Sequence, residues 1–232
     1  EPLFESVTAP SVTIDLHENV FVVVPRLPEG YTPEQSVRAQ RAILDQVIAA
    51  NGITRFVLWY YNPLAMTFSD HLRPAAIIYD CMDELSAFKN APADLRVLEQ
   101  ALLRRADVVF TGGLSLYEAK RNLHHNIHAM PSSVDVNHFA TPRTIAVDPP
   151  DQRELPHPRL GFVGVLDERV DIPLLRGIAE ARPAWQLVII GPVVKIDPSD
   201  LPRLPNIHYL GPKRYEELPA YLSGWVVAVL LF

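Results

Sequence analysis

Residues 159–194 read RLGFVGVLDERVDIPLLRGIAEARPAWQLVIIGPVV and contain the pattern that decides the fold. An apolar run at 160–165 is followed by a charged turn, a helical pattern and a second apolar run at 186–190. A strand, a helix and a second strand in this order predict a βαβ unit with parallel strands. Such units bind ligands at the carboxyl ends of their strands. We therefore expect residues 164–169 and 191–195 to face one crevice.

The composition limits the classes of partner. The chain has 232 residues and a net charge of −6, with acidic and basic side chains interspersed. Nucleic acids are bound by a basic face, so no nucleic acid is expected as the main partner. The single cysteine, Cys81, cannot form an internal disulfide, which favours a cytoplasmic location. We interpret Cys81 as a small buried apolar side chain rather than a nucleophile.

The order of the predicted elements indicates two domains. Strand and helix patterns alternate on both sides of residues 141–158, which contain five prolines and no periodic apolar pattern. We therefore expect an α/β protein with two Rossmann-like domains built on parallel sheets, the second of them incomplete. The predicted division is a first domain at 1–140, a linker at 141–158 and a partial second domain at 159–232.

Individual elements follow from the period of the apolar residues. The β-branched runs 12–16 and 20–24 predict two strands or a hairpin, and the pattern over 34–50 predicts a helix. The continuous apolar run 75–79 predicts a strand buried on both faces of a parallel sheet. The apolar residues 225–232 predict a final strand.

Carboxylates follow the predicted strand at 75–79. They belong to Asp80, Asp83 and Glu84. Charged groups are costly to bury, so we expect these carboxylates to line a cleft or to face solvent. An ionised carboxylate accepts two or more hydrogen bonds and is therefore a candidate for binding a polar ligand. The alternative is that Asp80 or Asp83 caps a helix beginning near Glu84.

Two other kinds of site are not expected. His124, His125 and His128 lie close together, but without neighbouring cysteines or carboxylates, so we predict no metal site there. No Gly-x-Gly-x-x-Gly motif follows a predicted strand, which disfavours a dehydrogenase or epimerase that binds a dinucleotide.

Several stretches together resemble the GT-B glycosyltransferases of the large retaining group called family 1 or family 4. The chain is similar in particular to bacterial members that act in teichuronic acid or other cell-surface polysaccharide synthesis. The stretches that carry this resemblance are residues 79–84, 106–109, 130–139, 161–164 and 215–225. The resemblance covers nearly the whole chain. It implies a GT-B fold in which residues 1–140 form the acceptor-side domain and 159–232 part of the domain that binds the nucleotide sugar.

The resemblance also implies an activity. A sugar would move from a nucleotide diphosphate sugar to a cell-surface polysaccharide or lipid-linked acceptor, with retention and without a metal or other cofactor. A cytoplasmic location at the inner face of the membrane, with peripheral association, fits such an acceptor. Family members begin with a further strand and glycine-bearing loop and continue into a segment with two glutamates, so we expect this chain to be a fragment lacking both ends. The alternative is a noncatalytic binding or assembly module of the same fold.

The resemblance assigns four residues to donor binding, namely Gly164, Arg169, Gly191 and Lys195. Arg169 lies where the family usually has a lysine, whereas Val165 occupies the position of its usual arginine. We therefore expect Arg169 to contact the diphosphate, because a leaving diphosphate needs positive charge. Lys195 either replaces the missing cation or is a solvated surface charge, and Arg169 has the same surface alternative.

In the first domain the resemblance makes Asp80 and Asp83 the catalytic candidates. Asp80 lies where many family members have a histidine beside the donor sugar, and Asp83 follows on the same loop. The expected role of these carboxylates is to bind sugar hydroxyls or to orient an acceptor, rather than to act as nucleophiles.

Overall fold

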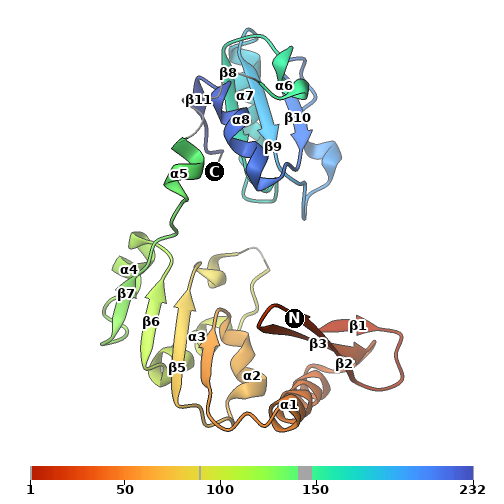
Figure 1. The fold of residues 1–232 in the computed structure, drawn as a ribbon, viewed down its shortest axis with the longest axis vertical. Coiled ribbons are helices and arrows are strands. Elements are labelled where there is room, and N and C mark those ends of the chain that lie inside the picture. Colours follow the sequence, from red (N-terminus) through yellow and green to blue (C-terminus); the bar gives the residue numbers. More distant parts are fainter. Residues whose placement is uncertain (1, 89, 141–147, 232) are drawn as a thin grey trace. The chain divides into compact units, whose positions relative to one another are not determined.

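The structure, a computed structural model, describes residues 2–88, 90–140 and 148–231 (Figure 1). The chain divides into two compact units, Glu1–Ser132 and Ser133–Phe232. Each unit contains a four-stranded parallel sheet, which confirms the predicted α/β class with parallel sheets.

The first unit combines a small mixed sheet with a parallel sheet. Strands β2 (Ser11–His17) and β3 (Val20–Pro28) form an antiparallel hairpin, and β1 (Leu3–Glu5) pairs in parallel with β3. The predicted pair of strands is therefore a hairpin, and its second strand continues to Pro28. The parallel sheet has the strand order β4 (Val57–Tyr60), β5 (Ala76–Cys81), β6 (Val108–Thr111) and β7 (Ile127–Ala129).

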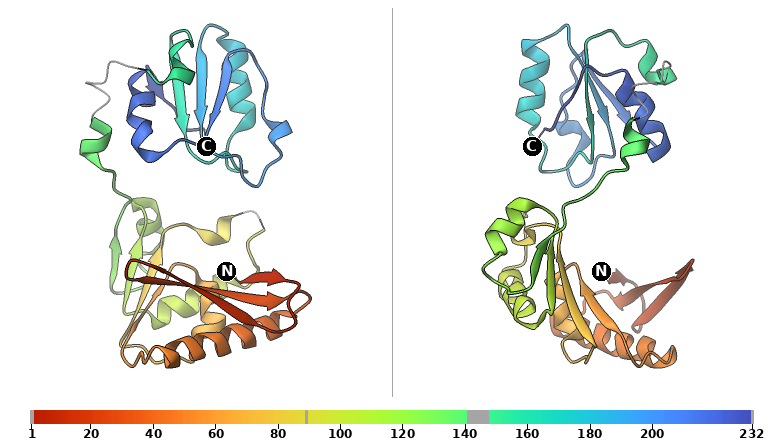
Figure 2. Two further views of the ribbon diagram at one scale, coloured as in Figure 1. Left: turned by 45° about the vertical axis from the view of Figure 1, so that its right-hand side comes forward. Right: turned by 60° about the vertical axis from the view of Figure 1, so that its left-hand side comes forward.

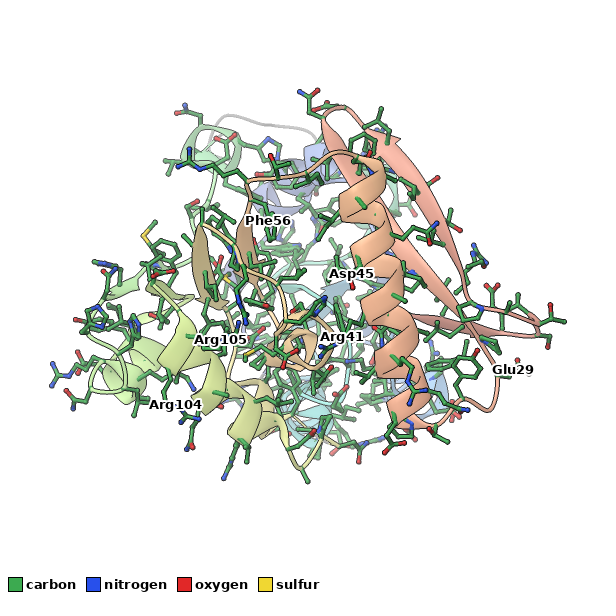
Figure 3. All side chains as sticks on the ribbon, turned by 90° about the horizontal axis from the view of Figure 1, so that it is seen from below. Glu29, Arg41, Asp45, Phe56, Arg104 and Arg105 are labelled. Carbon is green, nitrogen blue, oxygen red and sulfur yellow. The ribbon has the colours of Figure 1, made fainter. Side chains whose placement is uncertain are left out.

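Helix α1 (Pro33–Ala50) confirms the helix predicted over 34–50, and it begins with a capping box formed by Thr32 and Gln35. Asp70 ties α1 to the rest of the unit, because its carboxylate accepts from Arg41 of α1 and its carbonyl accepts from Arg105. Figure 3 shows Arg41 and Arg105 on the two helices that they belong to. The remaining helical elements are η1 (Pro63–Ala65), α2 (Met66–Ser69), η2 (Leu85–Ala87), α3 (Leu95–Arg105) and α4 (Leu114–Lys120).

The parallel sheet of the first unit is buried on one face. In β5 the side chains of Ile77, Tyr79 and Cys81 are buried, in a core that includes Leu102 and Leu103 of α3. The alternate residues of β5 are only partly buried, and Trp59 on the neighbouring strand is half exposed. The prediction of a strand buried on both faces is therefore wrong for β5, because the α3 core covers only one face of this strand.

In the second unit the sheet has the order β10-β9-β8-β11, with all strands parallel. Helices lie on both faces of this sheet (Figure 2), and every residue of its β9 strand is buried. The predicted βαβ unit is confirmed by β8 (Arg159–Val163), α7 (Ile172–Ala181) and β9 (Gln186–Ile190). The other elements are α5 (Val136–Ala140), α6 (Pro150–Arg153), η4 (Pro198–Asp200), β10 (Ile207–Gly211), η5 (Tyr215–Glu217), α8 (Leu218–Ser223) and β11 (Val227–Ala228).

The final strand is shorter than predicted. Only Val227 and Ala228 form a strand within residues 225–231, although the N–H groups of Val226 and Val229 donate to carbonyls of β8. Trp225 lies against Gly161, where a Cβ atom would come within 2.0 Å of the indole ring. Among the described residues, no helix is long and apolar enough to cross a membrane.

The described part of the predicted linker packs against the second unit. Residues 141–147 lie outside the described part of the chain, whereas residues 148–158 are held by the second unit. The side chain of Gln152 in α6 is fully buried, where it donates to the carbonyl of Tyr221 and accepts from the indole N–H of Trp225. On the other side of the linker, His138 of α5 stacks on Tyr215, so α5 belongs to the second unit.

Arg159 anchors the same segment to the sheet of the second unit. Its side chain is 2% exposed. The guanidinium donates to the carboxylate of Asp148 at 2.6 Å and to the carbonyl of Leu155 at 2.6 and 2.9 Å. Burial raises the pKa of Asp148, but the hydrogen bonds from Arg159 and Gln152 outweigh burial and leave that pKa below its ordinary value.

We predict that Arg159→Met lowers the free energy of unfolding of the second unit by about 3 kcal/mol, because it leaves the Asp148 carboxylate without its buried counter-charge. Urea unfolding followed by tryptophan fluorescence measures this loss. The matched control is Arg121→Met, which removes an exposed pair with Glu118 and should change stability by less than about 1 kcal/mol. Equal effects of the two substitutions would contradict the anchoring role of Arg159.

Candidate functional site at the carboxyl ends of the second sheet

A pocket of about 220 Å³ lies where β8, β9 and β10 end. This is the sheet edge at which open α/β sheets bind ligands. The pocket is lined by Val163, Gly164, Val165, Ile190, Gly191, Pro192, Pro212, Lys213 and Leu218. Gly164 and Gly191, two of the four predicted donor-binding residues, therefore line the same pocket.

Two glycines allow the backbones of neighbouring loops to meet at this pocket. Gly191 has φ +146°, and a Cβ atom on it would lie 1.8 Å from the carbonyl oxygen of Gly164. The N–H of Gly164 donates to Ile190 and that of Gly191 donates to Gly211. Only glycine fits position 191, because a side chain would be strained by φ and blocked by the carbonyl.

The charged turn after β8 places Arg169 beside Asp167. Asp167 is 5% exposed, and its carboxylate accepts from the backbone N–H and from the guanidinium of Arg169, with Nη2 at 2.7 Å. These hydrogen bonds hold the pKa of Asp167 below its ordinary value. Asp171 caps α7 by accepting from the N–H of Leu174, so a carboxylate already occupies the end of this helix that attracts anions.

Arg169 and Lys195 do not line the pocket with the two glycines. Lys195 is exposed on the loop after β9 and has φ +65°. The two loops are nevertheless paired, because Leu166 and Val193 form a parallel bridge. Of the two segments expected to face one crevice, only the starts line the pocket, with Gly164 and Val165 from the first and Gly191 and Pro192 from the second. The pocket itself brings together Gly164 and Gly191 with a residue of the next loop.

That residue is Lys213, which the sequence reasoning missed. Its Nζ lies 2.6 Å from the carboxylate of Asp151 in α6, and it lies 5.4 Å from the centre of the Tyr221 ring. The Tyr221 hydroxyl donates to the other oxygen of Asp151 at 2.7 Å. A lysine two residues after a strand-ending glycine was the available signal, since Gly211-Pro212-Lys213 repeats the strand-end position of Gly191.

In the first unit the two carboxylates of Asp80 and Asp83 have different surroundings. Asp80 is part of β5 and accepts from the indole N–H of Trp59 at 3.2 Å. Asp83 is exposed after the strand, and its carbonyl lies 3.5 Å from the thiol of Cys81. Neither caps a helix near Glu84, because the 3₁₀ turn there has no side-chain cap. The prediction that the carboxylates avoid full burial is confirmed.

A buried lysine holds the loop that contains Asp83. Lys120, 4% exposed, pairs with Glu84 at 2.8 Å and with Glu99 at 2.9 Å. Tyr79 also donates to Glu99, at 2.7 Å. Lys120, Glu84 and Glu99 line a pocket of about 400 Å³ together with Arg96. No periodicity in the sequence identifies this cluster, because its members come from four separate elements.

Other residues with possible chemistry have structural surroundings. The Cys81 side chain is buried, and burial raises the pKa of its thiol, which fits the interpretation as an apolar side chain. His124 bonds to the carbonyls of Ala106 and Asn126. Within residues 2–88, 90–140 and 148–231, no group of three or more histidine, cysteine and carboxylate side chains is arranged to hold a metal ion.

The chain has two α/β units built on parallel sheets, and solved structures with the GT-B fold match it. Sucrose-phosphate synthase from Thermosynechococcus elongatus matches with a TM-score of 0.63 and 16% identity, over 98% of this chain and 64% of that chain. The Anabaena protein Alr3699/HepE, solved in complex with UDP and glucose, matches with a TM-score of 0.62 and 13% identity, over 88% of this chain and 60% of that one. At these identities the likeness shows the fold.

One curated relative gives a match in sequence. It is the putative teichuronic acid biosynthesis glycosyltransferase TuaH of Bacillus subtilis, 27% identical in an alignment 202 residues long that covers 78% of this chain and 50% of TuaH. The chain thus spans about half the length of this relative. No family model matches the chain.

We predict that Gly191→Ala destabilises the second unit by ~1–3 kcal/mol, because it places a Cβ in a strained conformation against the Gly164 carbonyl. Gly177→Ala is the matched control. Gly177 lies within α7 with no atom within 4 Å of an added Cβ, so alanine there should stabilise the helix by about 1 kcal/mol. Urea unfolding of both variants measures the difference in sign. Equal stability of the two variants would contradict the close approach of the two loops.

We predict that Glu84 contributes to the pH dependence of stability. Burial raises its pKa, but hydrogen bonds from Lys120 and Ser86 outweigh this and hold the pKa below its ordinary value. A depressed carboxyl pKa stabilises the fold above the unfolded value of ~4.3 and loses this effect as the pH falls through the folded value. Glu84→Gln should therefore make the fall in Tm between about pH 5 and pH 3 shallower. Glu118→Gln, in an exposed pair, should leave the slope unchanged.

Proposed function

We propose that the chain is part of a glycosyltransferase that moves a sugar from a nucleotide diphosphate sugar to a saccharide or lipid-linked acceptor in cell-surface polysaccharide synthesis. The observation that carries the proposal is the pocket formed by Gly164 and Gly191 at the ligand-binding edge of the second sheet. The name of the relative TuaH and the UDP bound to HepE support the reaction and the donor.

On the donor side, Gly164 and Gly191 let the backbone approach the ligand closely, because neither has a side chain. We assign Arg169 and Lys195 to the diphosphate. Both lie on the loops that extend the pocket-forming strands. Positive charge at this edge would stabilise the leaving diphosphate as its bond to the sugar breaks.

On the acceptor side we assign Asp80 and Asp83. Both carboxylates are accessible, and Asp83 follows the strand end on a loop held by the Glu84–Lys120 pair. We propose that they accept hydrogen bonds from sugar hydroxyls and orient them. Transfer with retention, without a metal, is part of the same proposal. So is a cytoplasmic location with peripheral association at the inner face of the membrane.

A second candidate function is a noncatalytic binding module of the same fold. The observation favouring it is that Arg169 is already held by Asp167, in a turn that also contains Glu168 and Asp171. The two functions differ in whether the nucleotide sugar is cleaved. The parent polypeptide of an enzyme transfers sugar from its donor to an acceptor, whereas a module binds the nucleotide sugar without cleaving it.

We predict that the chain binds UDP or GDP, as measured by calorimetric titration. Arg169→Ala should weaken binding about 10- to 100-fold, since hydrogen bonds to charged groups contribute roughly 1.5–3 kcal/mol. Arg182→Ala is the control, because Arg182 lies over Trp185 at the far end of α7 and should bind as wild type. If neither nucleotide binds at millimolar concentration, the proposed function fails. If binding occurs but Arg169→Ala leaves it unchanged, only the role of Arg169 fails.

A further inference from the structure

Lys213 is the charged residue among the side chains that line the pocket of the second unit. The other lining residues are glycines, prolines and aliphatic side chains from the ends of β8 and β9, the loops that follow the strands and the start of α8. Lys213 follows β10 directly after Pro212, and its side chain is 18% exposed. A cation in a small pocket with otherwise apolar walls suits a ligand that combines an apolar or planar group with negative charge.

The position of Lys213 is fixed by two partners. Asp151 accepts from its Nζ through one carboxylate oxygen and from the Tyr221 hydroxyl through the other. The ring of Tyr221 lies beside the ammonium group. The hydrogen bond from Lys213 to Asp151 raises the pKa of the ammonium group, so Lys213 is charged at neutral pH. Asp151 and Tyr221 therefore hold a charged lysine at the pocket without closing it.

The burial of the carboxylate in the Arg169–Asp167 and Lys213–Asp151 pairs decides which of the two cations can leave its carboxylate for a ligand. In the Arg169 pair the carboxylate is buried and the cation is half exposed, with side chains 7% and 49% exposed. Losing Arg169 would remove the cation that is hydrogen-bonded to the buried Asp167 carboxylate, which is costly. In the Lys213 pair the carboxylate of Asp151 is 40% exposed. Asp151 would stay solvated and bound to Tyr221 if Lys213 moved away, so this exchange costs little.

We propose that Lys213 binds the phosphate groups of the nucleotide diphosphate sugar by moving from Asp151 to the ligand. This inference rests on the proposed function and adds to it a cation that its donor-side assignment does not contain. An ion pair whose carboxylate is exposed to water contributes little to stability, whereas phosphate groups offer Lys213 more negative charge and more acceptor oxygens than the Asp151 carboxylate does. The exchange is therefore favourable when phosphate enters. Asp151 acts as a competitor that keeps Lys213 at the pocket while no donor is bound.

Three variants test the exchange by calorimetric titration with UDP and with uridine. Lys213→Met should weaken UDP binding about 10- to 100-fold and leave uridine binding unchanged, since uridine has no phosphate. Lys213→Arg keeps the charge and should restore most of the affinity. Asp151→Asn keeps an acceptor for Tyr221 but removes the competing charge, so UDP affinity should rise up to about 5-fold.

The sign of the Asp151→Asn effect separates the proposal from a merely structural ion pair. If the pair only stabilises the fold, both Lys213→Met and Asp151→Asn lower Tm and neither changes UDP affinity at a temperature where the protein is folded. That result overturns the proposal while the proposed function stands. A wild-type chain that binds neither UDP nor GDP overturns both.

Discussion

The guanidinium group of Arg159 is buried inside the second unit, and a buried cation has to be matched in charge and in hydrogen bonds. Asp148 supplies the charge, and the carbonyl of Leu155 accepts further hydrogen bonds. Both partners belong to the segment before β8, so this segment cannot leave the sheet without leaving the buried charge unmatched. The hydrogen bonds of Arg159 therefore hold the proline-rich segment 148–158 against the second unit.

The anchored segment contains α6, and Asp151 of α6 contacts Lys213, which lines the pocket. Gln152 connects it to Trp225 and to the carbonyl of Tyr221, while Asp151 on the same helix contacts Lys213 and the Tyr221 hydroxyl. Tyr221 belongs to α8, which packs on the sheet face formed by Val188 and Ile190. The position of Lys213 at the pocket therefore depends on a chain of contacts that begins at Arg159.

The sequence predicts those parts of the fold in which neighbouring residues decide the structure. The βαβ unit from Arg159 to Ile190, the two strands of the hairpin and α1 follow from local periodicity, although the second hairpin strand extends to Pro28, beyond its predicted end. The structure of segment 148–158 could not be predicted. Its prolines indicate a loop although α6 forms there, and its position against the sheet depends on hydrogen bonds from the buried Arg159. The length of β11 also depends on partners, since its pairing with β8 covers only two residues.

The candidate site shows the same division between local and distant determinants. Gly164 and Gly191 could be identified from the sequence, because a glycine at the end of a buried strand often marks a close approach of another backbone or a ligand. For Lys213 the sequence contains only its position after Gly211, and its pairing with Asp151, 62 positions earlier in the chain, could not be predicted. The pairing of Arg169 with Asp167 is local in the sequence. Whether Arg169 can leave Asp167 depends on the burial of the Asp167 carboxylate, which the sequence does not show.

Burial also gives the two cations different properties toward an anion. Arg169 is held in place by the buried carboxylate of Asp167, which also offsets part of its charge. Lys213 has a four-carbon stem that can turn, and its carboxylate partner Asp151 is one that water can solvate. A fixed cation favours one geometry of a bound phosphate, whereas a mobile cation adds charge only when phosphate is present. In a donor site that uses both cations, Arg169 would fix the orientation of the bound phosphate. Lys213 would move to the ligand only when the ligand has a negative charge.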